Sequence, residues 1–441
     1  MKVKYKPEDF IVEEVLKEGV ILENARERYK VYLVQKKMLD TLSVMYDISR
    51  RLKIQRNRIY SCGLKDKYAI AKQYIAVEVE NAPKKISGQN WEAQMVGSAK
   101  APLSAKSIFR NIFRITLRDI HPEEVKEYEN NIKIVSSVGF PNYFDEQRFG
   151  SARHFADEKI NQDDILDFIG KRALQGDWEG ALKIHFQALS DSDRSRVKKF
   201  KKIMREKWGK WSECLVEAQE KNDIDVLRYL VRKQNDFKGA FFRIDSRLAR
   251  LYLEVYQNFI FNEILCEIIK QRFPHHYLFP YFVGNLVFPY RPDISNVSIV
   301  KNIIIPLPHK DAQIPHEITE IYHKILERER VSLQMFDTGD PKINFAKSMR
   351  NAWERPEQLN WKIQDDEYHQ GMKKIEISFS LRPGTFATVL IKNITPLNPK
   401  SDTEKKPNPI VYDQNGKEVV IHQKTQTEEK KKFIIISRST S

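Results

Sequence analysis

The chain has 441 residues, which is more than a single hydrophobic core usually organises, so its length predicts at least two domains. Its 75 lysines and arginines outnumber 60 aspartates and glutamates, which gives a formal net charge of +15. An excess of this size favours a polyanionic partner, because each phosphate contact releases condensed counterions. Charge alone is equally compatible with a basic protein that binds nothing acidic.

Cysteine usage and hydropathy exclude several classes of protein. Cys62, Cys214 and Cys266 stand far apart, so no pair has the spacing of a zinc knuckle or a redox CxxC motif. An odd number of cysteines does not build a disulfide framework and suits a reducing compartment, so we expect a cytoplasmic protein. The first residues lack the apolar core of a signal peptide, and no run of about 20 apolar residues occurs. We therefore expect no membrane segment.

Residues 1–80 read as β-strands with one helix inserted, and one further alternating segment follows at residues 109–117. Alternating β-formers predict strands at residues 29–34, 59–62, 73–79 and 109–117. Residues 41–52 carry apolar side chains at helical spacing, with Asp40 or Thr41 as the N-cap. Residues 63–66 then form the turn after the short second strand.

From about residue 155 the sequence pattern becomes helical, and strand-like sequence returns from residue 277. Charged, helix-period segments predict helices at residues 163–169, 192–204 and 246–271. Strand-like pieces follow at residues 277–305, and residues 374–392 read as strand, turn and strand about Pro383-Gly384. Beyond about residue 400 the composition is that of a tail, apart from a strand pair expected at 410–412 and 419–421.

β-type sequence at both ends therefore encloses a helix-rich middle, which is typical of a domain inserted at a surface loop. We predict an α+β fold. Residues 1–154 and 346–399 would form one domain, a mostly antiparallel mixed sheet flanked by helices. Residues 155–345 would form an inserted, helix-rich α+β domain, and residues 400–441 a C-terminal extension.

Several kinds of site lack support. There is no GxGxxG after a strand and no GxxxxGK[ST], so no nucleotide cofactor is expected. His309, His316 and His323 recur every seven residues, but no matched cysteine or carboxylate pattern accompanies them, so no metal is expected.

The segment GLKDKYAIAKQ at residues 63–73 is the strongest candidate for a site. Read alone, Asp66 is a turn aspartate of the kind that is usually structural. Two features fit a site: flanking Lys65 and Lys67 favour the ionised carboxylate, and a loop between two core strands is held rigidly yet stays reachable.

This segment resembles the GxKDxxAxTxQ motif of the TruD family of tRNA pseudouridine synthases, whose aspartate is the residue that every pseudouridine synthase requires. Four further segments match that family in the same order. They are PEDFIVEE at 7–14, NYFDEQRFG at 142–150, YQNFIFN at 256–262 and LRPGTFAT at 381–388. The chain is thus identified as a member of the family, of archaeal type, over nearly all of its length up to about residue 392.

The sequence departs from the family pattern at two places. The family threonine of GxKDxxAxTxQ is Ala71 here, and Lys106 and Arg110 stand where the family has glycines. Those glycines would let the backbone approach RNA closely, whereas two basic side chains add positive charge.

The resemblance implies the activity, the partner and the site residues. Asp66 would be catalytic, either attacking the ribose covalently or removing its C2′ proton to give a glycal. The substrate would be tRNA at position 13, no cofactor would be needed, and a monomer is expected. The residues implied to bind substrate are Lys4, Phe10, Glu14, Lys65, Asn142, Phe144, Arg148, Arg350 and Phe386.

Some of these residues have specific expected roles. Lys4 would be the basic partner of Asp66, Phe144 the ring that stacks on the flipped-out base, and Asn142 its polar neighbour. Without the resemblance, Phe144 and Asn142 would read as a core strand and a turn. We also expect a basic channel lined by Lys65, Lys67, Lys106, Arg110 and Arg148.

Three alternatives stay open at this point. The same chemistry could act on an anticodon-loop uridine or on another RNA. The chain could be a non-catalytic RNA-binding protein, against which the retained Asp66 argues. A metal-dependent nuclease is disfavoured by the lack of clustered carboxylate or histidine ligands.

Overall fold

The computed structural model describes residues 1–23, 26–150, 152–155, 165–189, 193–397, 411–413 and 418–419. The chain forms two compact units, one of residues 1–140 and 354–409 and the other of residues 141–353 and 410–441. Residues 141–154 and 346–353, expected with the sheet domain, thus belong to the second unit. Both segments pair or pack with elements of that unit, which periodicity within each segment cannot reveal.

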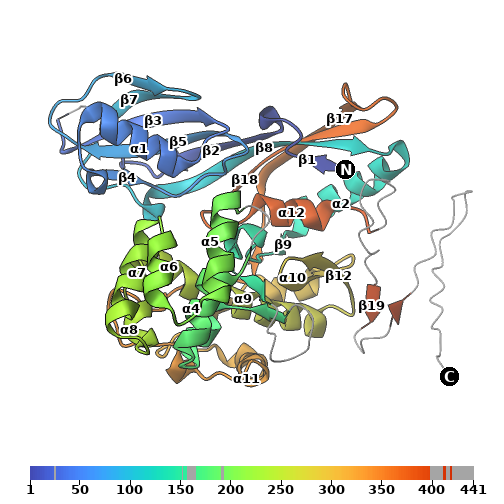
Figure 1. The fold of residues 1–441 in the computed structure, drawn as a ribbon. Coiled ribbons are helices and arrows are strands. Elements are labelled where there is room, and N and C mark those ends of the chain that lie inside the picture. The colour runs from blue at the N-terminus through green and yellow to red at the C-terminus, as the bar shows by residue number, and fades with distance from the viewer. Residues whose placement is uncertain are drawn as a thin grey trace, which may run out of the picture. The chain divides into compact units, whose positions relative to one another are not determined.

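The first unit is built on a ten-stranded sheet (Figure 1). Its strands are β1 (Lys2–Val3), β2 (Phe10–Leu16), β3 (Tyr29–Lys37), β4 (Ile59–Ser61), β5 (Ile70–Glu78), β6 (Lys85–Gly88), β7 (Trp91–Ala99), β8 (Ile108–Ile120), β17 (Glu357–Asp365) and β18 (Lys373–Leu381). Their order is β17-β18-β8-β2-β5-β3-β7-β6, with β1 paired to β8 and β4 to β5. The β2–β5 pair is parallel, with Ile11 opposite Ile70, and the other pairs are antiparallel.

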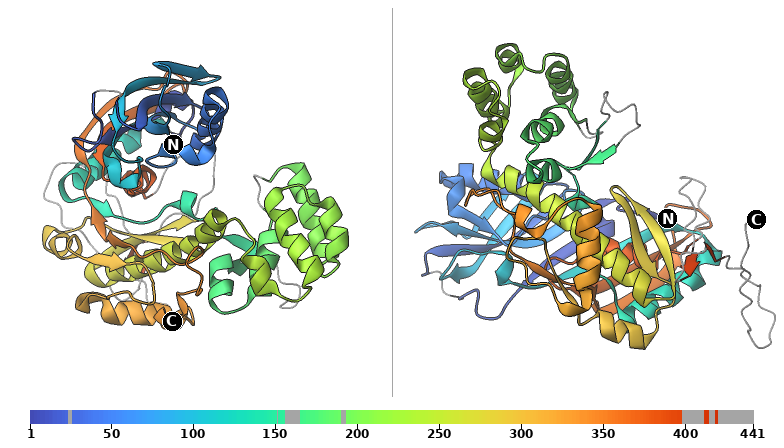
Figure 2. Two further views of the ribbon diagram at one scale, coloured as in Figure 1. Left: turned by 90° about the vertical axis from the view of Figure 1, so that its left-hand side faces the viewer. Right: turned by 90° about the horizontal axis from the view of Figure 1, so that it is seen from below.

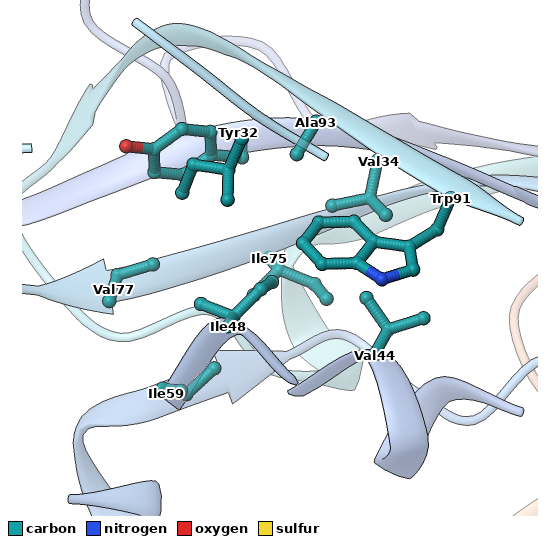
Figure 3. Packing of buried hydrophobic residues seen from close by; sticks show 10 residues of the cluster. Tyr32, Val34, Val44, Ile48, Ile59, Ile75, Val77, Trp91 and Ala93 are labelled. Carbon is teal, nitrogen blue, oxygen red and sulfur yellow. The ribbon is translucent and has the colours of Figure 1, made fainter. Parts of the chain in front are cut away.

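Helix α1 (Thr41–Leu52) packs against the part of this sheet that β3, β5 and β7 form. Figure 3 shows Val44 and Ile48 of this helix facing Ile75 and Trp91 of the sheet, and all four side chains are buried. The helix begins where predicted, because the Asp40 carboxylate accepts a hydrogen bond from the Ser43 amide at 2.8 Å. Its packing fixes the chain that leads into β4 and the loop beyond it.

The remaining helices of the first unit are α2 (Val125–Val138) and α12 (Ala387–Ile394), which pack against each other. Its described residues also form the short 3₁₀ turns η1 (Pro7–Asp9), η2 (Arg56–Arg58), η3 (Ala105–Ser107) and η4 (Pro122–Glu124).

The second unit is centred on α9 (Ser246–Arg272), a 27-residue helix with buried residues along its length. The other helices are α3 (Ile169–Leu174), α4 (Trp178–Gln187), α5 (Ser195–Glu206), α6 (Trp211–Glu217), α7 (Lys221–Arg232), α8 (Phe237–Phe241), α10 (Ile294–Val300) and α11 (Thr319–Arg328), with 3₁₀ turns η5 (Glu146–Arg148), η6 (His316–Ile318) and η7 (Leu333–Met335). Helices α4 to α8 stand together as a group (Figure 2).

Short strands complete the second unit. They are β10 (Arg153–Phe155), β11 (Ile165–Asp167), β12 (His275–Tyr281), β13 (Gly284–Pro289), β14 (Ile304–Pro306), β15 (Met349–Asn351), β19 (Val411–Asp413) and β20 (Glu418–Val419), while β9 (Phe140–Pro141) pairs with β16 (Trp353–Glu354) at the limits of the units. Strand β12 pairs with both β13 and β19, and β19 pairs with β20. The strand pair expected in the C-terminal extension is thereby confirmed, and its other residues lie outside the described part.

Most predicted elements are present, and two predictions are wrong. Residues 387–394 form α12 instead of a second strand, because a short apolar run fits helix and strand alike and Ala387, Leu390 and Ile394 share a helical face. Residues 165–167 form a strand where a helix was predicted, and α3 begins only at Ile169. No helix of the described residues is both long and apolar enough to cross a membrane.

Candidate active site

Asp66 lies in the loop that joins β4 to β5. The loop is tied to the start of α1, because the Lys65 amide donates to Thr41 Oγ1 at 2.9 Å. The Thr41 hydroxyl in turn donates to Gln73 Oε1 at 3.0 Å, and Gln73 is fully buried in β5. Helix α1 and strand β5 therefore hold the loop from two sides.

A buried lysine, Lys36, binds the backbone of the same loop. The Nζ atom of Lys36 donates to the carbonyl oxygens of Asp66 and Leu39, at 2.7 Å each, and to that of Lys65 at 3.3 Å. Lys36 is 1% exposed, and this burial lowers the pKa of its ammonium from 10.5 to about 8. The Asp66 and Asp40 carboxylates oppose that shift. The lysine therefore binds the backbone carbonyl of Asp66 and helps to fix the loop.

The carboxylate of Asp66 is paired with the ammonium of Lys4. The Lys4 Nζ atom lies 2.6 Å from Asp66 Oδ2, with the two side chains 22% and 26% exposed. Lys4 also lies over the Phe10 ring, 4.3 Å from its centroid. The Lys4 backbone has a φ of 59°, a left-handed conformation that costs a non-glycine residue roughly 1 kcal/mol and that collects at functional sites. The predicted partnership between Lys4 and Asp66 is present in the structure.

The predicted substrate residues Lys65 and Glu14 bind each other. The Lys65 ammonium pairs with Glu14 Oε1, and Glu14 Oε2 accepts from the Tyr74 amide at 2.8 Å. Their side chains are 11% and 0% exposed. The pair joins β2 to the Asp66 loop, so the geometry gives both residues a role in positioning Asp66.

Asn142, Phe144 and Arg350 form a cluster in the second unit. Arg350 donates to the Asn142 carbonyl at 2.8 Å, to Asn142 Oδ1 at 2.5 Å and to the Tyr143 carbonyl at 3.2 Å. Its guanidinium lies 4.3 Å from the Phe144 ring centroid. Asn262 of α9 holds the Phe144 backbone through two 2.8 Å hydrogen bonds. Arg350 therefore orders the Asn142–Phe144 segment, and Phe144 is only 8% exposed.

The other basic residues that were predicted to contact RNA differ in their exposure and in their ion pairing. Arg148 and Lys106 are exposed, on η5 and η3, and Lys67 is exposed in the Asp66 loop. Arg110, in contrast, has only 14% of its side chain exposed and pairs with Glu357 of β17. Phe386 is half-buried and occupies the N-cap position of α12, without a side-chain capping hydrogen bond. Lys65 and Arg110 thus use their charges within the first unit.

A basic surface on α5 was missed by the sequence analysis. Its exposed cations are Arg196, Lys198, Lys199, Lys202 and Arg205. Within the described ranges Lys198 and Lys199 form no ion pair. The first turn holds no acidic residue, although the helix dipole favours anions there. The signal was in the sequence, as the run SRVKKFKKIMR at 195–205, which periodicity alone had marked only as a helix.

No three histidine, cysteine or carboxylate side chains of the described residues gather closely enough to hold a metal ion.

Comparison with known proteins decides the family. A model of the family described as tRNA pseudouridine synthase D (TruD) matches residues 1–394. The chain belongs to the TruD family. As a member, it is a pseudouridine synthase, which is an isomerase.

Curated relatives agree with the assignment to the TruD family. A probable tRNA pseudouridine synthase D of Methanococcus maripaludis is 30% identical over 403 residues, covering 89% of this chain and 99% of that protein. A second, from Methanocaldococcus jannaschii, is 30% identical over 400 residues, covering 89% and 91%. The tRNA pseudouridine synthase D of Aquifex aeolicus is 28% identical over 414 residues, covering 89% and 98%.

The fold also matches that of a solved TruD-family structure. The crystal structure of the putative tRNA pseudouridine synthase D from Methanosarcina mazei has a TM-score of 0.63 to this chain. The match covers 90% of this chain and 94% of that one, at 22% sequence identity. The α+β fold with its mostly antiparallel sheet is thus shared.

Proposed function

We propose that this chain converts a uridine of tRNA, expected at position 13, to pseudouridine, with Asp66 as the catalytic residue. The observation that carries the proposal is the Lys4–Asp66 pair, at 2.6 Å and partly open to solvent. A carboxylate that must act on a ribose has to be ionised, reachable and fixed. Lys4 pairs with the carboxylate. The loop is fixed by the Lys36 ammonium, which donates to the Asp66 carbonyl, and by the Lys65 amide, which donates to Thr41 Oγ1.

The reaction breaks the N1–C1′ bond, turns the base and forms a C5–C1′ bond, after which the C5 proton is lost and N1 gains one. Breaking the first bond develops positive charge on the ribose, and a carboxylate beside C1′ stabilises that charge. Asp66 either bonds to C1′ and is later displaced, or removes the C2′ proton and later returns it. Both routes balance without a redox partner.

The target base must leave its stack, which costs a few kcal/mol, and an aromatic face recovers part of that cost. We assign this role to Phe144, with Arg350 ordering the segment that carries it. Asn142 and Arg148 would contact the nucleotide and its phosphate. Phe10 and Phe386 would shape the pocket around Asp66.

An unmodified tRNA transcript labelled with tritium at C5 of uridine tests the proposal. We expect tritium release, and mapping should place the pseudouridine at position 13, with release lost when that uridine is replaced by cytidine. Modification in the anticodon loop, or of another RNA only, would contradict position 13 as the target and leave the proposed reaction unchanged. Binding without tritium release from any RNA tested would leave a non-catalytic RNA-binding protein.

A further inference from the structure

Two exposed tyrosine rings lie side by side on the first unit. Tyr5 and Tyr368 are 49% and 50% exposed, and their ring centroids are 5.6 Å apart at an interplanar angle of 50°. Tyr5 lies just before η1, and Tyr368 lies in the turn between β17 and β18. Each half-exposed ring therefore presents part of its apolar face to solvent.

Lysines flank both rings. The Lys6 ammonium lies 4.8 Å from the Tyr368 centroid and donates to the Tyr368 hydroxyl at 3.3 Å. The Lys2 ammonium lies 5.7 Å from the Tyr5 centroid. Both lysines also have an acidic neighbour: Lys6 lies 3.9 Å from Glu367, and Lys2 lies 3.3 Å from Asp119. Glu367 is shared with Arg118 at 3.1 Å and Lys374 at 3.0 Å. Aromatic faces with ammonium groups beside them are the combination that binds single-stranded nucleic acid.

The turn that carries Tyr368 is fixed from below by buried ion pairs. Arg118 is 2% exposed and donates to Asp9 Oδ2 at 2.8 Å and to Asp366 Oδ1 at 3.0 Å. Asp366 also accepts from the Tyr368 amide at 3.0 Å. The Arg118 guanidinium supports the Tyr368 ring, 4.7 Å from its centroid. A ring held in this way is ordered before any ligand binds, which lowers the entropy cost of stacking.

Chain connectivity places this pair next to the proposed catalytic residues. Tyr5 directly follows Lys4, whose ammonium contacts Asp66, and consecutive Cα atoms are only about 3.8 Å apart. An RNA strand that brings a ribose to Asp66 therefore carries its neighbouring nucleotide past Tyr5.

We propose that Tyr5 and Tyr368 form a stacking site for an unpaired base of the RNA that flanks the target uridine. The proposal rests on the function proposed above and adds a second contact beyond the target nucleotide. Stacking tolerates any base, because every base has a π-face, so this site would hold the strand without reading its sequence. Tyr5 and Tyr368 would thus bind the substrate RNA away from the reacting nucleotide.

The test uses the full chain with Asp66→Asn, so that RNA is bound but not converted. The probe is the tRNA transcript with 2-aminopurine at the nucleotide before or after the target. We expect fluorescence quenching at one of the two positions. Quenching should be lost, and the dissociation constant raised about tenfold, when Tyr5→Leu and Tyr368→Leu are added. Tyr46→Leu is the matched control, since Tyr46 is 45% exposed and lies under Arg56 at 4.2 Å.

A second readout separates this proposal from the proposed function. With Asp66 intact, the double variant should raise KM about tenfold and change kcat little. Wild-type KM and unaltered quenching in the double variant would overturn the stacking site while the synthase activity stands. If the wild-type chain releases no tritium yet the tyrosines still govern quenching, the proposed function fails and the stacking site survives.

Discussion

The ammonium of Lys4 lies 2.6 Å from the carboxylate of Asp66, joining the first residues of the chain to the loop between β4 and β5. Lys4→Met removes this partner and leaves the alkyl part over Phe10. We expect kcat to fall on the order of 10-fold to 100-fold, since a charge-assisted hydrogen bond is worth about 1.5–3 kcal/mol. Steady-state tritium release measures the change.

Lys4→Arg is the matched control, because it keeps the charge and should recover part of the lost turnover. Equal activity in Lys4→Met and wild type would show that Asp66 does not depend on this pair.

Lys36 predicts a pH dependence of stability. Burial lowers the pKa of its ammonium from 10.5 to about 8, so between these values the unfolded chain binds more protons than the folded one. The free energy of unfolding should therefore gain a positive contribution as pH rises from 8 to 10.5. Urea unfolding of wild type and Lys36→Met across this range isolates that contribution as the difference between them. Parallel curves for the two proteins would remove Lys36 as its source.

Phe144→Leu keeps an apolar side chain of similar size in a site that is 8% exposed but removes the aromatic ring. We expect turnover to fall about tenfold or more while the protein stays folded, because a reactive pose depends on base stacking. Phe261→Leu is the control, since Phe261 packs edge-on against Phe144 and is fully buried. Equal losses in both variants would point to packing and not to stacking.

The lysines of α5 predict a salt dependence. If Lys198 and Lys199 contact tRNA phosphates, Lys198→Ser with Lys199→Ser should weaken binding and reduce the slope of log K against log salt by about one to two. Lys84→Ser with Lys85→Ser is the control, because these two lysines are also consecutive and exposed, and they lie at the start of β6 and directly before it. If the slope for the α5 variant equals that of the wild type, Lys198 and Lys199 do not contact tRNA phosphates.

Local patterns predicted the local elements of the fold. Helix α1 has the expected bounds because apolar spacing and the Asp40 cap both lie within it. Strand β18 joins the sheet that holds β5, as expected, through β8 and β2. The ion pair between Arg110 and Glu357 was not predicted, because 247 positions separate the two residues and no local pattern links them. The Lys65–Glu14 pair was not predicted either, although both residues were expected to bind substrate, because 51 positions separate them along the chain.

The most direct measurement is tritium release from tRNA by Asp66→Asn, with tRNA affinity measured on the same protein. Asp365→Asn is the matched control, since the Asp365 side chain is 90% exposed and makes one surface ion pair with Lys373. We predict that Asp66→Asn abolishes tritium release. Its affinity for tRNA should stay within a few-fold of wild type, because binding rests on many phosphate contacts. Asp365→Asn should behave as wild type in both measurements. Wild-type turnover by Asp66→Asn would contradict the assignment of Asp66 as the catalytic residue.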